Sequence, residues 1–305
     1  MYRQSLFYLF FFLAAIFTAF IPVSVFAVTV GPAKMEYSAD PGTIIEGIIT
    51  LINDNSARQT LYPAFEKFTE VGGQKRFLPA EQTELANWVK LPKSVTLDLG
   101  EQKRIPFTIE IPQKAPPGGH FAVIWWGTAS SESKQVSIVT RAGILVYLRV
   151  SGEVNESAEL LKFAAEGGFF QTKMPENFVI SFKNSGNTYQ KPQGDILIKN
   201  IFGGKITDFG VNEINAIFLP DTENNLRIAK KFEKAPFAFG FYKANLSLQW
   251  GEKPDSLQKG IWFFVFPWKY VLGGLIILFI LFFGAKRGLR KYNERVIKRY
   301  ANNQR

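Results

Sequence analysis

The stretch from Pro267 to Ala285, PWKYVLGGLIILFILFFGA, limits most strongly what this chain can fold into. No charge interrupts the 15 residues from Val271 to Ala285. As a helix the whole stretch would span about 28 Å, close to the thickness of a bilayer core. Trp268 and Tyr270 would then lie in the aromatic belt at the membrane surface, where the Lys269 side chain reaches the headgroups. The sequence predicts one transmembrane helix. A hydrophobic hairpin in a soluble core is the alternative, although soluble helices are rarely apolar on every face.

Basic residues follow this apolar run directly. Residues 286–305 hold eight lysines and arginines against Glu294 alone, which gives this tail a net charge of +7. A basic cluster beside a membrane span marks its cytoplasmic end, so the chain before Pro267 is expected on the extracytoplasmic side. The tail would also attract anionic lipids of the inner leaflet. Its basic residues are Lys286, Arg287, Arg290, Lys291, Arg295, Lys298, Arg299 and Arg305.

The charge and the residue types of the remaining chain exclude several classes of function. Removing +7 for the tail and +1 each for Arg3 and Lys269 from the total of +10 leaves +1, so no nucleic-acid partner is expected. The chain has no cysteine, which rules out disulfides, thiol catalysis and Cys-ligated metals. A single histidine, His120, leaves little scope for a His-ligated metal or a Ser-His-Asp triad. No phosphate-binding loop, dinucleotide fingerprint or hydrolase motif is present, so neither an enzyme nor a small-molecule substrate nor a cofactor is expected.

The N-terminus, residues 1–27, has the pattern of a signal peptide. Arg3 gives a short positive region, and an apolar run from Leu6 to Phe20 ends before Pro22. Val25 and Ala27 place small residues three and one before a cleavage site. We expect the mature chain to begin near Val28; a retained anchor helix is the alternative, and both place the following segment outside the cytoplasm.

Residues 28–266 contain short β-type runs separated by Gly, Pro and Asn, a spacing that predicts all-β sandwiches. The polar segment Ser151–Ser157 marks a boundary, giving domains at 28–152 and 153–260. Only Glu81–Leu91 has a helical pattern. Ile261–Phe266 is either a last strand or an interfacial segment, and we favour an apolar connection that leads into the span at 261–285. The expected strands are Thr43–Ile52, Leu61–Phe68, Ser94–Leu99, Ile105–Ile111, Phe121–Trp126, Val136–Val150, Ala158–Ala164, Phe178–Lys183, Asp195–Ile201, Lys205–Asn212, Ile214–Leu219 and Tyr242–Trp250.

The two halves resemble each other. Ile48–Asn55 and Val179–Asn187 are both apolar runs that end in an Asn-rich turn. Ala115–Trp126 and Ala235–Trp250 both begin with Ala-Pro, pass through Gly and an aromatic residue, and end in Trp before Gly. Similar punctuation at similar spacing predicts a duplicated unit, and about 100 residues per unit fits one immunoglobulin-like sandwich. The predicted fold is therefore two tandem immunoglobulin-like β-sandwiches followed by one C-terminal transmembrane helix.

From Val30 to about Trp126 the first domain resembles the WxL-interacting proteins, which are membrane-anchored surface proteins of bacteria. The resemblance implies two immunoglobulin-like domains before one membrane helix, a first domain that binds peptidoglycan and a second that binds a surface protein. The matching residues are Asp40–Thr43 before a strand ending at Asn53, Gly72-Gly73, Ser94–Leu97 before Gly100-Glu101, Ile111-Pro112 and Pro117–Gly119.

Candidate binding residues are few. Trp125 and Trp126 would point to opposite faces of a strand, one into a core and the other over a flank or as a platform for sugar rings. Trp88 has the same two interpretations, and the three together are the candidate binding surface. His120 is expected in a surface loop. Asp221–Asn224 offers oxygen ligands for a loose Ca²⁺ but lacks EF-hand spacing, so no metal site is predicted.

These observations favour a non-catalytic protein of the bacterial cell surface, held by one membrane helix with its C-terminus in the cytoplasm. Its immunoglobulin-like domains would bind or scaffold cell-wall polymer or another surface protein. The alternative is a chaperone-like or structural subunit of an envelope assembly or secretion machine, since an extended partner can add a strand to a sheet edge.

Overall fold

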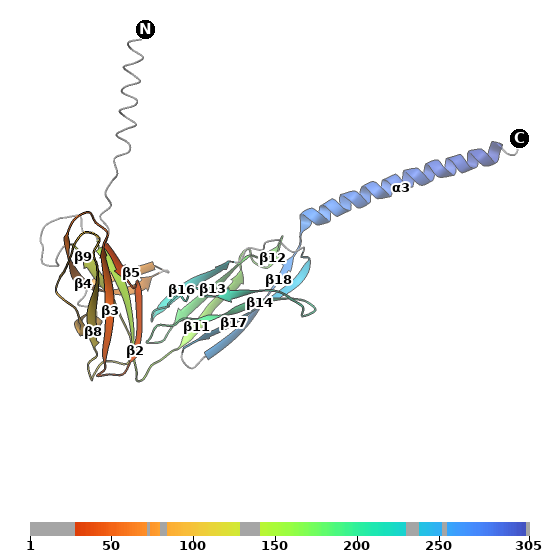
Figure 1. Cartoon of the computed structure of the whole chain (residues 1–305). Coiled ribbons are helices and arrows are strands. Elements are labelled where there is room, and N and C mark those ends of the chain that lie inside the picture. Colours follow the sequence, from red (N-terminus) through yellow and green to blue (C-terminus); the bar gives the residue numbers. More distant parts are fainter. Residues whose placement is uncertain are drawn as a thin grey trace, which may run out of the picture. The chain divides into compact units, whose positions relative to one another are not determined.

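The fold is described from a computed structural model of residues 28–71, 74–79, 84–128, 141–229, 238–251 and 255–302. The predicted signal peptide lies outside these residues. The chain forms two compact units (Figure 1). Unit 1 extends to Asn155 and includes Gly186–Tyr189, and unit 2 contains Glu156–Ser185 and the chain from Gln190.

Unit 1 is a sandwich of two sheets. One sheet has the strand order β1-β3-β8-β6, and the other has the order β2-β10-β9-β4-β5, with β7 pairing β4. All pairs are antiparallel except β2 with β10. Its elements are β1 (Val28–Gly31), β2 (Lys34–Ala39), β3 (Ile44–Asn53), β4 (Gln59–Val71), β5 (Gln74–Pro79), α2 (Leu85–Trp88), β6 (Val89–Lys90), β7 (Val95–Leu97), β8 (Gln102–Glu110), β9 (Gly118–Gly127) and β10 (Arg141–Val150).

Unit 2 repeats this plan. A sheet β11-β13-β16 faces a sheet β12-β18-β17-β14-β15. Again there is one parallel pair, β12 with β18, and it joins the strand of the larger sheet that comes first in the chain to the one that comes last. The strands are β11 (Ala158–Ala165), β12 (Phe170–Gln171), β13 (Asn177–Asn184), β14 (Gln193–Asn200), β15 (Lys205–Val211), β16 (Thr222–Ala229), β17 (Gly240–Trp250) and β18 (Asp255–Val265).

The matching strand orders agree with the predicted duplication. β3 corresponds to β13 and β9 to β17, the strands in which the sequence repeat was found. β9 and β17 both begin at or next to a glycine with positive φ, Gly118 at 117° and Gly240 at 111°. Glycine adopts this conformation without steric cost, which explains why a glycine stands at the start of each of these strands. Two sandwiches and one apolar helix confirm the predicted fold class.

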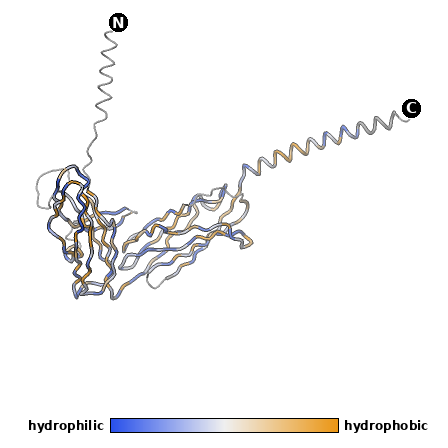
Figure 2. The backbone as a smooth tube through the Cα atoms, viewed as in Figure 1, coloured by the Kyte–Doolittle hydropathy of each residue, from blue (hydrophilic) through white to orange (hydrophobic). Residues whose placement is uncertain are grey.

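Each unit has its own apolar core between its sheets. Alternate residues of the central strands point inward, for example Ile49 and Leu51 on β3, which are fully buried. In unit 2, Ile180 on β13 and Ala244 on β17 are fully buried in the same way. Figure 2 shows the resulting mixture of apolar and polar residues along the strands, in contrast to the continuous apolar stretch of the C-terminal helix.

A buried asparagine is the last residue of a central strand of the smaller sheet in each unit. The Asn53 amide, fully buried, donates to the carbonyl oxygens of Ala57 at 2.9 Å and Asp98 at 2.9 Å, and its oxygen accepts from the Asn55 N–H at 3.1 Å. Asn184, also fully buried, donates to the Phe218 carbonyl at 3.0 Å. In both units the Asn of the sequence repeat therefore adds side-chain hydrogen bonds between the end of this strand and neighbouring loops.

Three sequence predictions of secondary structure are wrong. The helix expected over Glu81–Leu91 is confined to α2 among the described residues, since Val89 already pairs with β8. Ile214–Leu219 is not a strand, and the strand forms later as β16, where Thr222–Ala229 pairs with β13. Ile261–Phe266 is not a connection, because β18 pairs with β17 as far as Val265. The second sandwich therefore extends beyond residue 260.

Two residues, Phe266 and Pro267, separate β18 from the C-terminal helix α3 (Trp268–Asn302). Within the described chain it is the one helix that is long and apolar enough to cross a membrane, over Trp268–Asn293. The cytoplasmic basic residues predicted from the sequence, Lys286, Arg287, Arg290 and Lys291, lie on this same helix and are exposed.

Replacement of the buried amide tests its role. Asn53→Ala is expected to lower the free energy of unfolding by about 3 kcal/mol, because the carbonyl groups of Ala57, Leu97 and Asp98 lose this side-chain donor. Ser56→Ala, an exposed change in the same turn, should stay within about 0.5 kcal/mol. Urea unfolding of the full chain in detergent, followed by tryptophan fluorescence, measures both. Equal effects would contradict this role of Asn53.

The Glu166–Arg227 pair of unit 2 gives a pH dependence. Hydrogen bonds from the Arg227 guanidinium at 2.6 and 2.9 Å hold the pKa of Glu166 below its usual range. A lowered pKa in the folded state stabilises the protein above the ordinary carboxyl pKa, and this stabilisation is lost as the pH falls through the folded value. Arg227→Gln should therefore lower the unfolding midpoint slightly at neutral pH and not in acid, and carboxyl NMR titration should show the Glu166 pKa rising. An unchanged Glu166 pKa would contradict the pair.

Candidate binding surface along the open edge of β8

Strand β8 has a neighbour along one side only for most of its length. It pairs with β3 from Gln102 to Glu110, whereas β6 covers only Thr108 and Ile109 on the other side. The chain leaves the sheet after β6 through Pro92 and continues into β7, which pairs with β4 in the other sheet. Proline has no N–H for a ladder, so Pro92 ends the pairing here. Among the described residues no strand pairs with this side of Gln102–Phe107, which we call the β8 edge.

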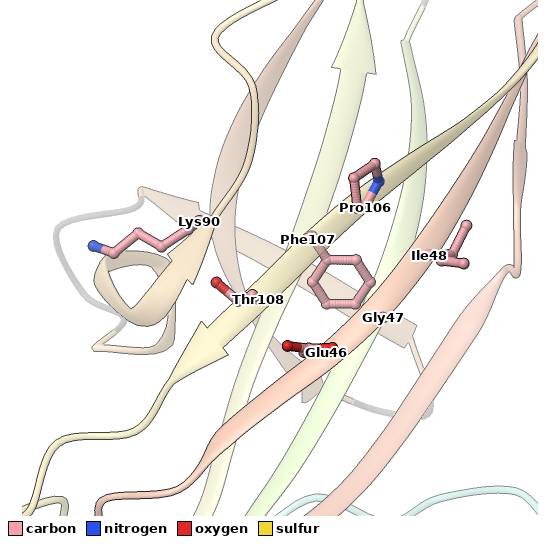
Figure 3. A pocket seen from close by; sticks show the side chains of 7 residues that line it. All are labelled: Glu46, Gly47, Ile48, Lys90, Pro106, Phe107 and Thr108. Atoms are coloured by element: carbon pink, nitrogen blue, oxygen red, sulfur yellow. The ribbon is translucent and has the colours of Figure 1, made fainter.

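The first of two hollows beside the β8 edge is largely apolar. Its volume is about 770 Å³, and Gly47 and Phe107 form its floor (Figure 3). A Cβ atom at Gly47 would come within 2.4 Å of the Phe107 ring, so only glycine allows the ring to lie there. Ile48, 45% exposed, adds an apolar wall. The full lining is Glu46, Gly47, Ile48, Lys90, Pro106, Phe107 and Thr108.

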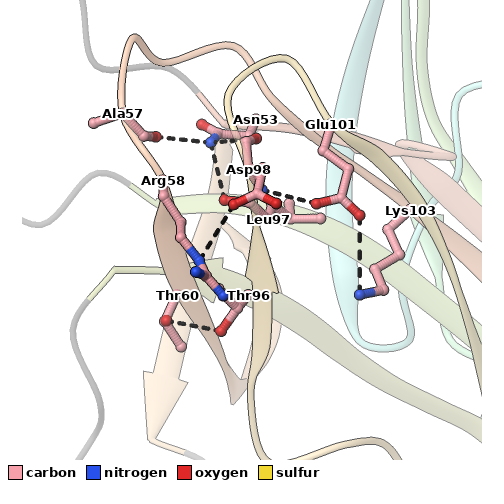
Figure 4. Close-up of polar contacts among 9 residues, drawn as sticks. All are labelled: Asn53, Ala57, Arg58, Thr60, Thr96, Leu97, Asp98, Glu101 and Lys103. Atoms are coloured by element: carbon pink, nitrogen blue, oxygen red, sulfur yellow. Dashed lines mark hydrogen bonds and ion pairs between the residues drawn. The ribbon is translucent and has the colours of Figure 1, made fainter.

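The second hollow is polar and has a volume of about 470 Å³. It lies where the β8 edge faces β7, and ion pairs hold its rim (Figure 4). Asp98 pairs with Arg58 at 3.3 Å, and Glu101 accepts a hydrogen bond from the Asp98 N–H at 2.8 Å and pairs with Lys103 at 4.0 Å. Both signs of charge are present, so this flank suits a neutral or mixed polar ligand.

The position of Pro106 indicates which backbone groups the edge offers. It lies opposite Ile48 on β3. Sheets tolerate proline where its missing N–H would point away from the neighbouring strand. Because orientation alternates along a strand, Gln102 and Arg104 then direct their N–H and C=O groups to the open side. The β8 edge thus presents unpaired backbone donors and acceptors between two hollows, as an added strand requires.

Two of the three tryptophans predicted as a binding surface are buried. Trp126 is fully buried in the core of unit 1, and Trp88 is 8% exposed. Trp88 packs against the ring of His120, with centroids 4.7 Å apart. The prediction that these two residues bind a partner is therefore wrong, because both contribute to the core.

Trp125 points to the other face of β9, as expected, but its ring already contacts other side chains of unit 1. The Arg141 guanidinium lies 4.3 Å above it, and its indole N–H donates to Glu66 at 2.9 Å. Phe77 contacts it edge-on with centroids 5.1 Å apart. Gly143 leaves the space that the indole occupies, since a Cβ atom there would lie 2.5 Å from the ring. This packing favours a structural role over a platform for sugars.

The remaining predicted residues have structural positions. His120 lies in β9 and not in a loop, with Nε2 2.9 Å from the Pro116 carbonyl oxygen. Asp221 has a positive φ of 56° at the turn before β16. The described residues contain no group of three His, Asp or Glu side chains able to hold a metal ion. Burial raises the pKa of the Tyr37 and Tyr147 hydroxyls, so both stay neutral near pH 7.

The predicted membrane anchors lie at the start of α3. Trp268 is 47% exposed and Tyr270 74% exposed, and the Lys269 ammonium lies 5.8 Å from the Trp268 ring. These are the exposures that interfacial residues need.

No family model and no curated protein matches this chain. Solved structures with a similar fold include the class 5 fimbriae chaperone CfaA, with 15% identity over 77% of this chain and 98% of that one and a TM-score of 0.41. A complex of the Salmonella enterica SafA pilin with the SafB chaperone matches with 11% identity, 79% and 99% coverage and a TM-score of 0.38. The CsuC–CsuE chaperone–tip adhesion subunit complex of Acinetobacter baumannii matches with 12% identity, 68% and 92% coverage and a TM-score of 0.35. Identities and scores this low carry no inference about function.

Truncation of Trp125 separates a structural role from a binding role. Trp125→Ala is expected to lower the free energy of unfolding by about 2 kcal/mol, because the ring contacts of Arg141 and Phe77 are lost. Val71→Ala, at a residue that is 61% exposed, is the control and should change it by less than about 0.5 kcal/mol. Urea unfolding measures both. An unchanged stability together with lost retention on purified cell wall would instead make Trp125 a ligand-binding residue.

Proposed function

We propose that this protein is a non-catalytic, membrane-anchored protein of the bacterial envelope that binds an extended segment of another protein along the β8 edge. The observation that carries the proposal is the unpaired side of Gln102–Phe107 between two hollows. A chain added here would gain backbone hydrogen bonds from the edge and place alternate side chains in the hollows.

The character of the site supports a protein partner. The apolar hollow beside Ile48 and Phe107 suits an aliphatic or aromatic side chain, and the Lys90 and Glu46 charges at its rim suit polar neighbours. The described residues provide no exposed tryptophan platform at this edge, which sugar rings would favour. Binding of cell-wall polymer, which the resemblance to WxL-interacting proteins implies, is therefore the less favoured form of the proposal.

The basic residues of α3 support the orientation in the membrane that we propose. With the basic residues that begin at Lys286 in the cytoplasm, both sandwiches lie on the extracytoplasmic side. The partner is then a protein of the cell surface or one that is being exported. An open strand edge pairs with a partner segment that is still extended. We therefore place a chaperone-like role in envelope assembly first, ahead of static scaffolding.

Site-specific crosslinking in native cells tests the proposal. A photoreactive amino acid replaces Gln102, which is exposed on the β8 edge, or Glu223, which is exposed on the corresponding strand β16 of unit 2. A discrete adduct with one protein is expected from position 102 and not from position 223. Mass spectrometry of the adduct then identifies the partner and shows whether it is a resident surface protein or a secreted subunit.

Backbone variants show whether the edge itself binds. Arg104→Pro removes the outward N–H and should lower the adduct yield about tenfold, whereas Arg104→Thr keeps the N–H and should preserve it. Pro106→Thr adds an N–H and should preserve or raise the yield. Unfolding midpoints confirm that each variant is folded. Equal yields from Arg104→Pro and Arg104→Thr, or retention on purified cell wall without any protein adduct, would overturn the proposal.

A further inference from the structure

Unit 2 carries a cluster of exposed phenylalanines that its core does not use. Phe241 and Phe264 lie 4.7 Å apart, measured between ring centroids. Phe170 is 6.3 Å and Phe239 6.2 Å from Phe264, and Phe266 is 6.0 Å from Phe239. We call these five residues the aromatic patch. Phe170 is 75% exposed, and Phe239, Phe241 and Phe266 are between 41% and 56% exposed.

Strand register places the aromatic patch on the outer face of the larger sheet, at one end. Phe264 pairs with Phe241 on one side and with Phe170 on the other. Their neighbours Tyr242, Phe263 and Val265 point the opposite way and are buried in the core. Exposure of so many aromatic side chains in one place is unusual for a surface in contact with water alone.

The same end of the sheet leads into α3. The Phe266 N–H donates to the Gln171 carbonyl at 2.8 Å, and the Trp268 N–H donates to the Phe266 carbonyl at 2.8 Å. Phe266, a residue of the aromatic patch, is therefore hydrogen-bonded to Trp268, the first residue of α3. If α3 crosses the bilayer, the chain cannot place the patch far from its surface, which identifies the lipid as the occupant.

A turn at this end adds a further exposed aromatic residue. Asn200 lies opposite Tyr242, so the β14–β15 turn that follows is at the patch end of the sheet. The Asn200 side-chain oxygen accepts hydrogen bonds from the N–H groups of Phe202 at 3.0 Å and Gly204 at 2.8 Å. The turn holds Phe202 with 93% of its surface exposed, beside Ile201 at 59%.

Basic and amphipathic side chains form the next row away from this end. Lys199 pairs with Lys243, which pairs with Trp262, and the Lys243 ammonium lies 5.7 Å from the Trp262 ring. Apolar rings at the end of a domain, followed by Trp and Lys, reproduce the order of groups found from the acyl boundary to the headgroups of a bilayer.

We propose that the aromatic patch and Phe202 insert into the extracytoplasmic leaflet beside α3, with Lys199 and Lys243 contacting anionic phospholipid headgroups. Unit 2 is then held against the membrane by its own surface as well as by the helix. The inference rests on α3 spanning the bilayer and is independent of the β8 edge.

The absence of native cysteine makes the test direct. The full chain carrying Phe202→Cys is labelled with a nitroxide and reconstituted into vesicles of phosphatidylcholine and phosphatidylglycerol. The control is Ile214→Cys, because Ile214 is 86% exposed and follows Val211, which pairs with Gly194 at the opposite end of the same sheet. Power-saturation EPR compares the accessibility of each label to oxygen, which partitions into lipid, and to a water-soluble nickel chelate.

The label at position 202 should be several-fold more accessible to oxygen than to the nickel chelate, and the label at 214 should show the reverse. Phe170→Ser with Phe241→Ser should make the 202 label more accessible to the nickel chelate than to oxygen, and Lys199→Gln with Lys243→Gln should weaken its insertion when phosphatidylglycerol is present.

Equal exposure of both labels to the chelate would overturn the proposal. Spin–spin broadening that disappears on dilution with unlabelled chain would do so too, since a second copy would then cover the patch. Arg104→Pro should leave all of these readings unchanged, which separates this test from that of the β8 edge.

Discussion

Burial of apolar side chains between two facing sheets, without any disulfide to assist it, is the constraint on which each unit depends. A sandwich of about 100 residues buries enough surface to be stable only if nearly every inward position is apolar. Both units meet this condition with fully buried residues on their central strands, such as Leu51 and Ile180. Where the central strand of the smaller sheet ends, a buried asparagine side chain donates to backbone carbonyl groups of neighbouring segments, at Asn53 and again at Asn184.

The duplicated plan makes the differences between the units informative. Unit 1 inserts α2 and β6 between β5 and β7, and β6 covers only the end of β8 before Pro92 directs the chain to the other sheet. The β8 edge stays open between the two hollows. In unit 2 the distinctive feature is the aromatic patch, which lies at the end of the sheet where β18 leads into α3. On our two proposals, unit 1 would bind a protein segment and unit 2 would contact the bilayer.

The β8 edge and the aromatic patch, if both act as proposed, would work together at the membrane surface. Contact of unit 2 with the lipid would restrict how unit 2 moves about its helix, in addition to the tether that α3 provides. Restricting an anchored binding domain to the membrane surface raises its effective concentration toward partners that are also at that surface or emerging from it. Backbone hydrogen bonds would carry binding at the β8 edge, whereas apolar burial and the charges of Lys199 and Lys243 would carry the contact with lipid.

The sequence by itself determined the features that depend on composition and local period. The 15 uncharged residues from Val271 to Ala285 predict a membrane span, the basic residues beyond them set the predicted orientation, and the alternating β-branched runs predict sandwiches. The repeated Asn-rich turns even revealed the duplication. Short segments were predicted less well: Ile214–Leu219 has the composition of a strand, but only the partner strand β13 decides that Thr222–Ala229 pairs instead.

Tertiary structure decided which faces and edges remain available. Alternation predicted that Trp125 and Trp126 point in opposite directions, but not that Arg141 and Phe77, which are distant in sequence, would cover the outer ring. No local pattern marks the β8 edge as open, because openness depends on where β6 ends and β7 turns away. The aromatic patch likewise joins Phe170, Phe241 and Phe264 from three separate strands. Long-range strand pairing brings such residues together, and the register of that pairing cannot be predicted from any one segment of the sequence.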